Sequence, residues 1–97
     1  MVIGLSTFEL HLPHAHSLKD KRKVVKGLVD RVHHRFKVSI IESGHHDLRQ
    51  RAEVTLVLVA LTDTEAEQIF DAIRRLIDEI FDAVLVRWDP ELMDVHA

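Results

Sequence analysis

The sequence contains no cysteine and only three glycines and two prolines. Without cysteine, the chain can form no disulfide, no thiolate zinc site and no cysteine nucleophile, and the cytoplasm is the expected compartment. Its glycines, Gly4, Gly27 and Gly44, are too widely separated for a P-loop, a dinucleotide-binding fingerprint or a G-x-x-G clamp. No G-x-S-x-G elbow occurs either, so the sequence shows none of these signatures of catalysis or nucleotide binding.

Long apolar runs are also missing. The longest largely apolar stretch, Val54 to Leu61, is far shorter than the roughly 20 residues of a spanning helix, so no membrane association is expected. The first residues, Met1 to Leu5, have no basic segment before them and soon alternate with polar side chains, which predicts a strand and not a signal peptide. With 97 residues, 46% hydrophobic and 30% charged, the composition is that of one globular domain covering residues 1–97.

Hydrophobic periodicity predicts four strands and two helices. Period-two alternation marks the strands, and spacings of three and four mark the helices. Ser17 is the expected N-cap of the first helix and Thr62 or Thr64 that of the second, whose apolar repeat extends to Phe81. The expected strands cover residues 2–12, 37–43, 51–61 and 83–88. This βαββαβ order predicts an α+β, ferredoxin-like sandwich with a four-stranded antiparallel sheet and two helices on one face. The acidic last residues are expected to cover a sheet edge or to fray.

The sheet face opposite the helices should be mixed in character. Odd positions of the first and third strands combine polar residues such as Glu9 and Glu53 with apolar ones such as Ile3, Val57 and Val59. Such a face is too polar for a core and too apolar for plain solvent exposure. We expect a second subunit, giving a homodimer, or another partner to cover it; a partly apolar but free face is the alternative.

Charge is distributed unevenly along the chain. Residues 13–37 carry eight Lys or Arg and two Asp, whereas residues 62–97 carry three Arg and ten Asp or Glu. The net charge of the whole chain is −3. The first turns of the first helix are rich in cations although the helix macrodipole disfavours them there. Exposed cations, free amides and a serine hydroxyl suit phosphate groups; a solvated polar face is the alternative reading. The candidate anion-binding residues are Ser17, Lys19, Lys21, Arg22, Lys23, Lys26, Arg31, Arg35 and Arg51.

Arg51 and Lys21 are candidates only if their side chains reach the surface of the first helix. Arg51, like Arg49, joins the patch only if the long turn before the third strand folds towards it. Lys21 lies on the apolar side of the helix, where its stem could cover the sheet while its amine reaches solvent. A partly desolvated amine acting as base or nucleophile is the less favoured interpretation of Lys21.

Eight histidines raise the possibility of a metal site. His11, His14 and His16 flank the loop before the first helix, but no thiolate or H-E-x-x-H pattern accompanies them. We therefore expect neither a metal nor a cofactor. The RNA-recognition fold stacks bases on aromatics of its central strands, and the third strand has none, so RNA stacking on the open sheet is not expected.

The segment His16-Ser17-Leu18-Lys19-Asp20-Lys21-Arg22 resembles the H-S-L-K-x-K-R signature of the YlxP-like family, a bacterial domain of unknown function. Gln50-Arg51-Ala52, after Asp47, resembles the family's later D-x-x-Q-R-A element. The resemblance implies a ferredoxin-like fold and, because members are often encoded among translation and ribosome-maturation genes, a link to the ribosome or RNA. It implies no activity, cofactor or catalytic residue. His14, His33, His45 and His46 depart from the family pattern.

Three functions are compatible with these observations. The favoured one is a non-catalytic module that contacts RNA or a ribosomal subunit through its basic first helix. The alternative is a homo-oligomeric or protein-interaction module that uses the open sheet face. The least favoured is an enzyme acting on a small phosphorylated ligand through Lys21 or Ser17, because no base–nucleophile arrangement accompanies them.

Overall fold

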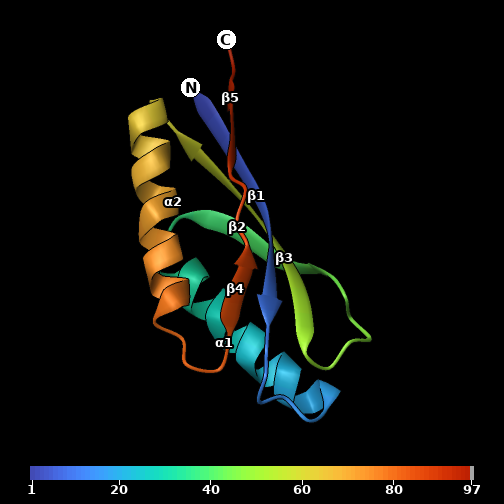
Figure 1. Ribbon diagram of the computed structural model, residues 1–97. Coiled ribbons are helices and arrows are strands. Elements are labelled where there is room, and N and C mark those ends of the chain that lie inside the picture. Colours follow the sequence, from blue (N-terminus) through green and yellow to red (C-terminus); the bar gives the residue numbers. More distant parts are fainter. Residues whose placement is uncertain (97) are drawn as a thin grey trace.

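The computed structural model describes residues 1–96, which form one sheet and two helices (Figure 1). Ala97, the last residue of the predicted domain, lies outside the described residues. No described helix is both long enough and apolar enough to cross a membrane. The elements are β1 (Val2–His11), α1 (Leu18–Arg35), β2 (Val38–Gly44), β3 (Arg51–Ala60), α2 (Asp63–Asp78), β4 (Val84–Arg87) and β5 (Glu91–Asp94).

The strand order β2-β3-β1-β4, with antiparallel neighbours throughout, is that of the ferredoxin-like fold. The predicted fold class is confirmed in its α+β composition, antiparallel sheet and paired helices. β1 and β3 pair without interruption from Val2 opposite Ala60 to His11 opposite Arg51. β3 is a central strand, as predicted, because it pairs with β1 on one side and with β2 on the other. Its residues from Leu56 to Ala60 are apolar on both faces, but Val57 and Val59, on the open face, are exposed.

A fifth strand corrects the predicted four-stranded sheet. Of the two alternatives expected for the acidic C-terminal segment, the structure shows the first: it covers a sheet edge, where β5 pairs with the first half of β1, from Leu5 opposite Glu91 to Val2 opposite Asp94. β4 pairs with the other half of β1, so both occupy the same edge of the sheet. Pro90 has no amide to donate and separates the two segments. The sequence predicted a single last strand at this edge, and the structure has two short strands there, β4 and β5.

Both helices begin at the expected side-chain caps. The Ser17 hydroxyl accepts the Asp20 amide at 3.0 Å, and Asp20 Oδ2 accepts the His16 amide at 3.1 Å. Thr62, not Thr64, caps α2 by accepting the Glu65 amide at 3.1 Å. Each cap satisfies a backbone amide that has no partner within the helix, which fixes where the loop ends and the helix starts.

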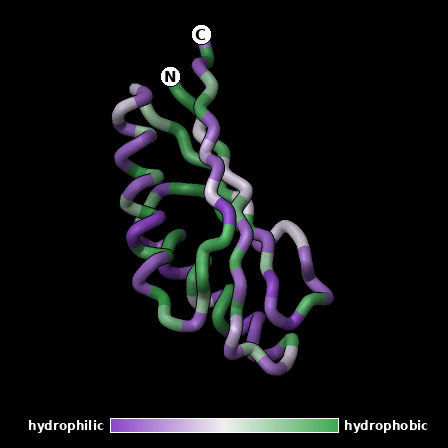
Figure 2. The backbone as a smooth tube through the Cα atoms, in the orientation of Figure 1, coloured by the Kyte–Doolittle hydropathy of each residue, from purple (hydrophilic) through white to green (hydrophobic). Residues whose placement is uncertain are grey.

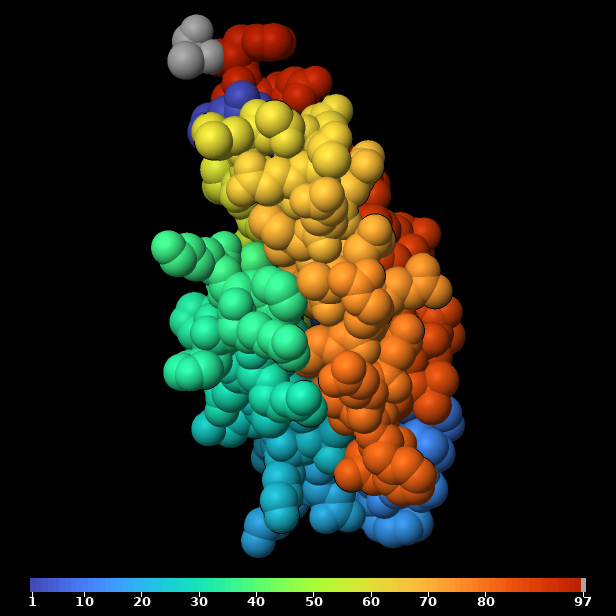
Figure 3. Space-filling model, turned by 90° about the vertical axis from the view of Figure 1, so that its left-hand side faces the viewer, coloured from blue at the N-terminus to red at the C-terminus, as the bar shows by residue number. Residues whose placement is uncertain are grey.

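The core lies between the helices and the even-numbered face of β1 and β3, and the second half of β3 is hydrophobic (green in Figure 2). Phe8 and Phe70 pack around Trp88, with ring centroids 5.3 and 6.0 Å from it. Gly4 allows α2 to approach: a Cβ added there would lie 2.6 Å from Phe70 Cε2. These contacts fix α2 on the sheet, and α1 lies beside it (Figure 3).

The open sheet face, opposite the helices, divides into two halves. Register places an apolar half towards the β5 end, where Val59 and Met93 flank Ile3 and are 60% and 53% exposed. The other half is polar and includes Glu9, Arg51, Glu53 and Arg87. The apolar half consists of Ile3, Leu5, Val57, Val59 and Met93. Ser39 and Glu91 border it opposite Val57 and Leu5, and Ile41 lies in the next row, opposite Thr55.

Candidate nucleic-acid interface

Helix α1 presents a surface of exposed cations. Lys19, Arg22, Lys23 and Lys26 share one side of the helix and are all exposed, as expected from their spacing. Successive turns rise about 5.4 Å, so these charges form a short row along the helix axis. We call these four residues the basic row.

The basic row is largely free of internal partners. Its one ion pair among the described residues joins Lys26 Nζ to Asp30 Oδ2 at 3.3 Å, and both side chains are mostly exposed. A solvent-exposed pair of this kind contributes at most about 1 kcal/mol and is screened by salt. The cations are therefore available to an external anion.

The outer side of α2 has the opposite sign. Asp63, Glu65, Glu67, Asp71 and Asp78 are exposed on α2 together with Arg74 and Arg75, so five carboxylates outnumber two cations. α1 and α2 lie side by side, cyan-green and yellow-orange in Figure 3. A polyanion would therefore be attracted to the α1 side of this layer and repelled from the α2 side.

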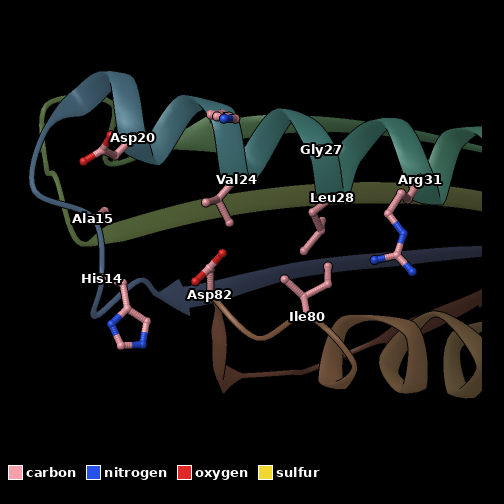
Figure 4. A pocket seen from close by; sticks show the side chains of 10 residues that line it. His14, Ala15, Asp20, Val24, Gly27, Leu28, Arg31, Ile80 and Asp82 are labelled. Carbon is pink, nitrogen blue, oxygen red and sulfur yellow. The ribbon is translucent and has the colours of Figure 1, made fainter.

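The remaining helix residues of the predicted set take different positions. Arg31 and Arg35 are exposed on the second half of α1, and Arg31 extends towards the turn after α2 (Figure 4). Ser17 is half-buried, and its oxygen already accepts the Asp20 amide. Its hydroxyl hydrogen can still be donated to an anion.

Lys21 was predicted to be one of the anion-binding residues, and the structure corrects this prediction because its side chain is not exposed. The residue is fully buried, and its Nζ donates to the carbonyl oxygens of His45 at 2.6 Å, His46 at 3.3 Å and Arg51 at 3.3 Å. Glu42 Oε1 lies 3.6 Å from the same nitrogen. The sequence predicted that the stem would carry the amine to solvent. In the structure the chain encloses the amine instead, so it cannot reach a nucleic acid.

The Lys21 amine instead fixes the turn between β2 and β3. His45, its nearest partner, has φ 59°, the only positive value among the described non-glycine residues. That conformation is unfavourable for a residue with a Cβ atom and persists only where surrounding contacts enforce it. The ammonium group supplies such a contact, so α1 and the turn are held together from the interior.

Arg51 also departs from the predicted set. It lies on the open sheet face, away from α1, where its Nη2 donates to Glu9 Oε1. His45 Nε2 donates to the same oxygen at 2.8 Å. The hydrogen bond from His45, followed by the Arg51 guanidinium, holds the pKa of Glu9 below its ordinary value despite partial desolvation. Arg51 is therefore part of a charge cluster on the sheet and not of the basic row.

A groove separates α1 from the turn after α2 (Figure 4). It has a volume of about 490 Å³, and Val24, Leu28 and Ile80 form its apolar lining. Lys23 and Arg31 line it from α1, and Asp82 extends towards α1 from the opposite side (Figure 4). At one end the His14 ring stacks on Phe81, with centroids 5.5 Å apart and planes inclined by 6°.

The sequence did not identify this groove. Phe81 fits the apolar repeat of the second helix, but α2 ends at Asp78 and leaves the Phe81 side chain 84% exposed. His14 carries no signal except its residue type. Arg49, left conditional by the sequence, donates to the His16 carbonyl at 3.5 Å and so lies beside the start of α1. Within residues 1–96, no three His, Asp or Glu side chains converge as a metal site would require.

Comparison with known proteins places the chain in a family. Residues 3–89 match the family described as "Protein of unknown function (DUF503)". The chain belongs to this family. It is 34% identical over 77 residues to the uncharacterized protein YlxP of Bacillus subtilis (strain 168), covering 79% of this chain and 84% of that protein. The predicted YlxP-like resemblance is therefore confirmed.

Among solved structures, the DUF503 chain is similar to a de novo designed protein with a ferredoxin fold, determined by solution NMR. The two are 14% identical, with a TM-score of 0.49, and the match covers 100% of this chain and 88% of the designed one. The strand order described above establishes the fold independently of this likeness.

Proposed function

We propose that this DUF503 protein is a non-catalytic RNA-binding module that contacts phosphates through the basic row of α1. The observation that carries the proposal is the exposure of Lys19, Arg22, Lys23 and Lys26 on one side of a helix, with a single exposed ion pair among them. Backbone phosphates are the polyanion that such a row neutralises without sequence selectivity. The acidic side of α2 limits the contact to one part of the surface.

The proposal gives a quantitative expectation for salt dependence. Four phosphate contacts correspond to a slope of about −3 in the logarithm of affinity against the logarithm of salt concentration. Affinity for a short structured RNA, or for purified ribosomal subunits, should then fall about 50-fold between 50 and 200 mM salt. Fluorescence anisotropy with labelled RNA measures the slope. Absence of binding to RNA and to both subunits at 50 mM salt would contradict the proposal.

A second candidate function, self-association, is favoured by the apolar half of the open sheet face. We infer that a second copy of this chain covers it. The ten-residue strands β1 and β3 are about 33 Å long and four strand positions span about 19 Å, so the whole face measures roughly 600 Å² and its apolar half roughly 300 Å². Each partner in a stable interface buries about 800 Å², so a dimer formed through this face would also cover its polar half.

Light scattering at several protein concentrations tests this second candidate. We expect a dimer that Val59→Arg converts to a monomer, because Val59 lies 60% exposed within the apolar half. Phe81→Arg is the matched control, since Phe81 is an exposed apolar residue in the turn after α2 and not on the sheet. A wild-type protein that is monomeric at all concentrations would rule out self-association as a function.

A further inference from the structure

Gly27 is an unexplained residue in the middle of α1. Glycine in a helix interior costs about 1 kcal/mol relative to alanine, so its presence usually reflects close packing. Here a Cβ added at Gly27 would meet no atom within 4 Å. The fold does not require the glycine, and its position opens the wall of the groove between α1 and the turn after α2.

Beside one end of this groove, the fold leaves the aromatic ring of Phe81 open, next to His14, which lines the groove. Phe81 is 84% exposed and is stacked only on one side in the described chain, by the His14 ring. The open face of such a ring can stack on a ligand with a planar face. Nucleobases stack on such aromatic rings in single-stranded RNA recognition, whatever their sequence.

The charges around the groove suit a nucleoside better than a phosphate alone. Lys23 and Arg31 are balanced by Asp20 and Asp82, so the lining has no net formal charge. Asp20 already accepts the His16 amide, whereas Asp82 has no hydrogen bond or ion pair among the described residues. A carboxylate in this position can accept hydrogen bonds from a base amino group, and Lys23 connects the groove to the basic row.

We propose that the groove holds one unpaired nucleotide of a bound RNA. Its base lies over Phe81 with an amino group donating to Asp82, and its phosphate lies at Lys23. Gly27 leaves room for the ribose or base against the helix. The inference rests on the proposed RNA-binding function and adds to it a specific site and a preference for bases that carry an amino group.

Single-stranded octanucleotides of cytidine and of uridine test the site. The two bases have similar size, but cytosine donates from its amino group where uracil accepts. Wild-type protein should bind oligocytidine about tenfold more tightly than oligouridine, and Asp82→Asn should reduce that ratio towards one. Phe81→Ala should weaken binding of oligocytidine about tenfold. Leu61→Ala, equally exposed but before the start of α2, should leave it unchanged.

Gly27→Gln distinguishes a loss of oligonucleotide affinity from a loss of stability. The substitution should raise the melting temperature, because glutamine is the better helix former, while lowering oligonucleotide affinity about tenfold by filling the groove. Salt-sensitive RNA binding that is unaffected by Phe81→Ala and Gly27→Gln would overturn the nucleotide site and leave the basic-row function intact. No binding of either oligonucleotide or of structured RNA would overturn both.

Discussion

Replacing Lys21 by alanine is expected to lower the free energy of unfolding by about 3–5 kcal/mol, the usual cost of removing one partner from a buried charged pair. The change deletes the donor to three carbonyl oxygens and the cation beside Glu42. It also leaves a cavity where the stem lay. Because small domains are stabilised by only about 5–15 kcal/mol in total, urea denaturation should show a large shift of the midpoint.

Lys21→Met measures the contribution of the amine separately from that of the apolar stem. Methionine keeps most of the apolar length, so the loss that remains reports on the unsatisfied carbonyls, each costing about 1–3 kcal/mol when buried. Lys19→Ala is the matched control: its side chain is exposed, and its effect should stay within about 0.5 kcal/mol. A Lys21→Met protein as stable as the wild type would show that the amine does not hold the turn.

Reversing Lys19 and Lys23 to glutamate is expected to abolish most RNA affinity without changing the fold. The two changes remove two phosphate contacts and place two carboxylates in the basic row, so affinity at 50 mM salt should fall about 100-fold or more. The salt slope should become shallower by about 1.5, half of the slope expected for four contacts. Circular dichroism should be unchanged because both side chains are exposed.

Arg74→Glu with Arg75→Glu is the control for net charge. It changes the total charge of the protein by the same four units, on exposed residues of α2 and not α1. RNA affinity should fall only slightly in this variant, through long-range repulsion. An equal loss in both double variants would show that net charge, and not the basic row, determines binding.

Local signals in the sequence predicted most of the fold. The caps at Ser17 and Thr62 depend on residues three positions apart, and the central position of β3 follows from apolar side chains on both of its faces. β5 was missed because its pairing with β1 is remote in sequence, and Glu91 and Asp94 are weak strand formers.

The candidate site was predicted less completely. The basic row follows from helical spacing, but the partners of Lys21 are backbone carbonyls of a distant turn, which leave no pattern in the sequence. Arg51 could have been placed correctly, since strand parity puts it on the same face as Glu53. Phe81 could not, because its spacing continues the helical repeat beyond the point where α2 ends.

Chemical-shift mapping of the isotope-labelled protein with a short structured RNA at low salt tests the central claim most directly. If the basic row binds phosphates, the largest amide shifts should lie in residues 17–31, with further shifts around Phe81 and Asp82 if the groove is occupied. The apolar half of the open sheet should be unaffected. Shifts concentrated on β1 and β3, or no shifts at all, would contradict binding through α1.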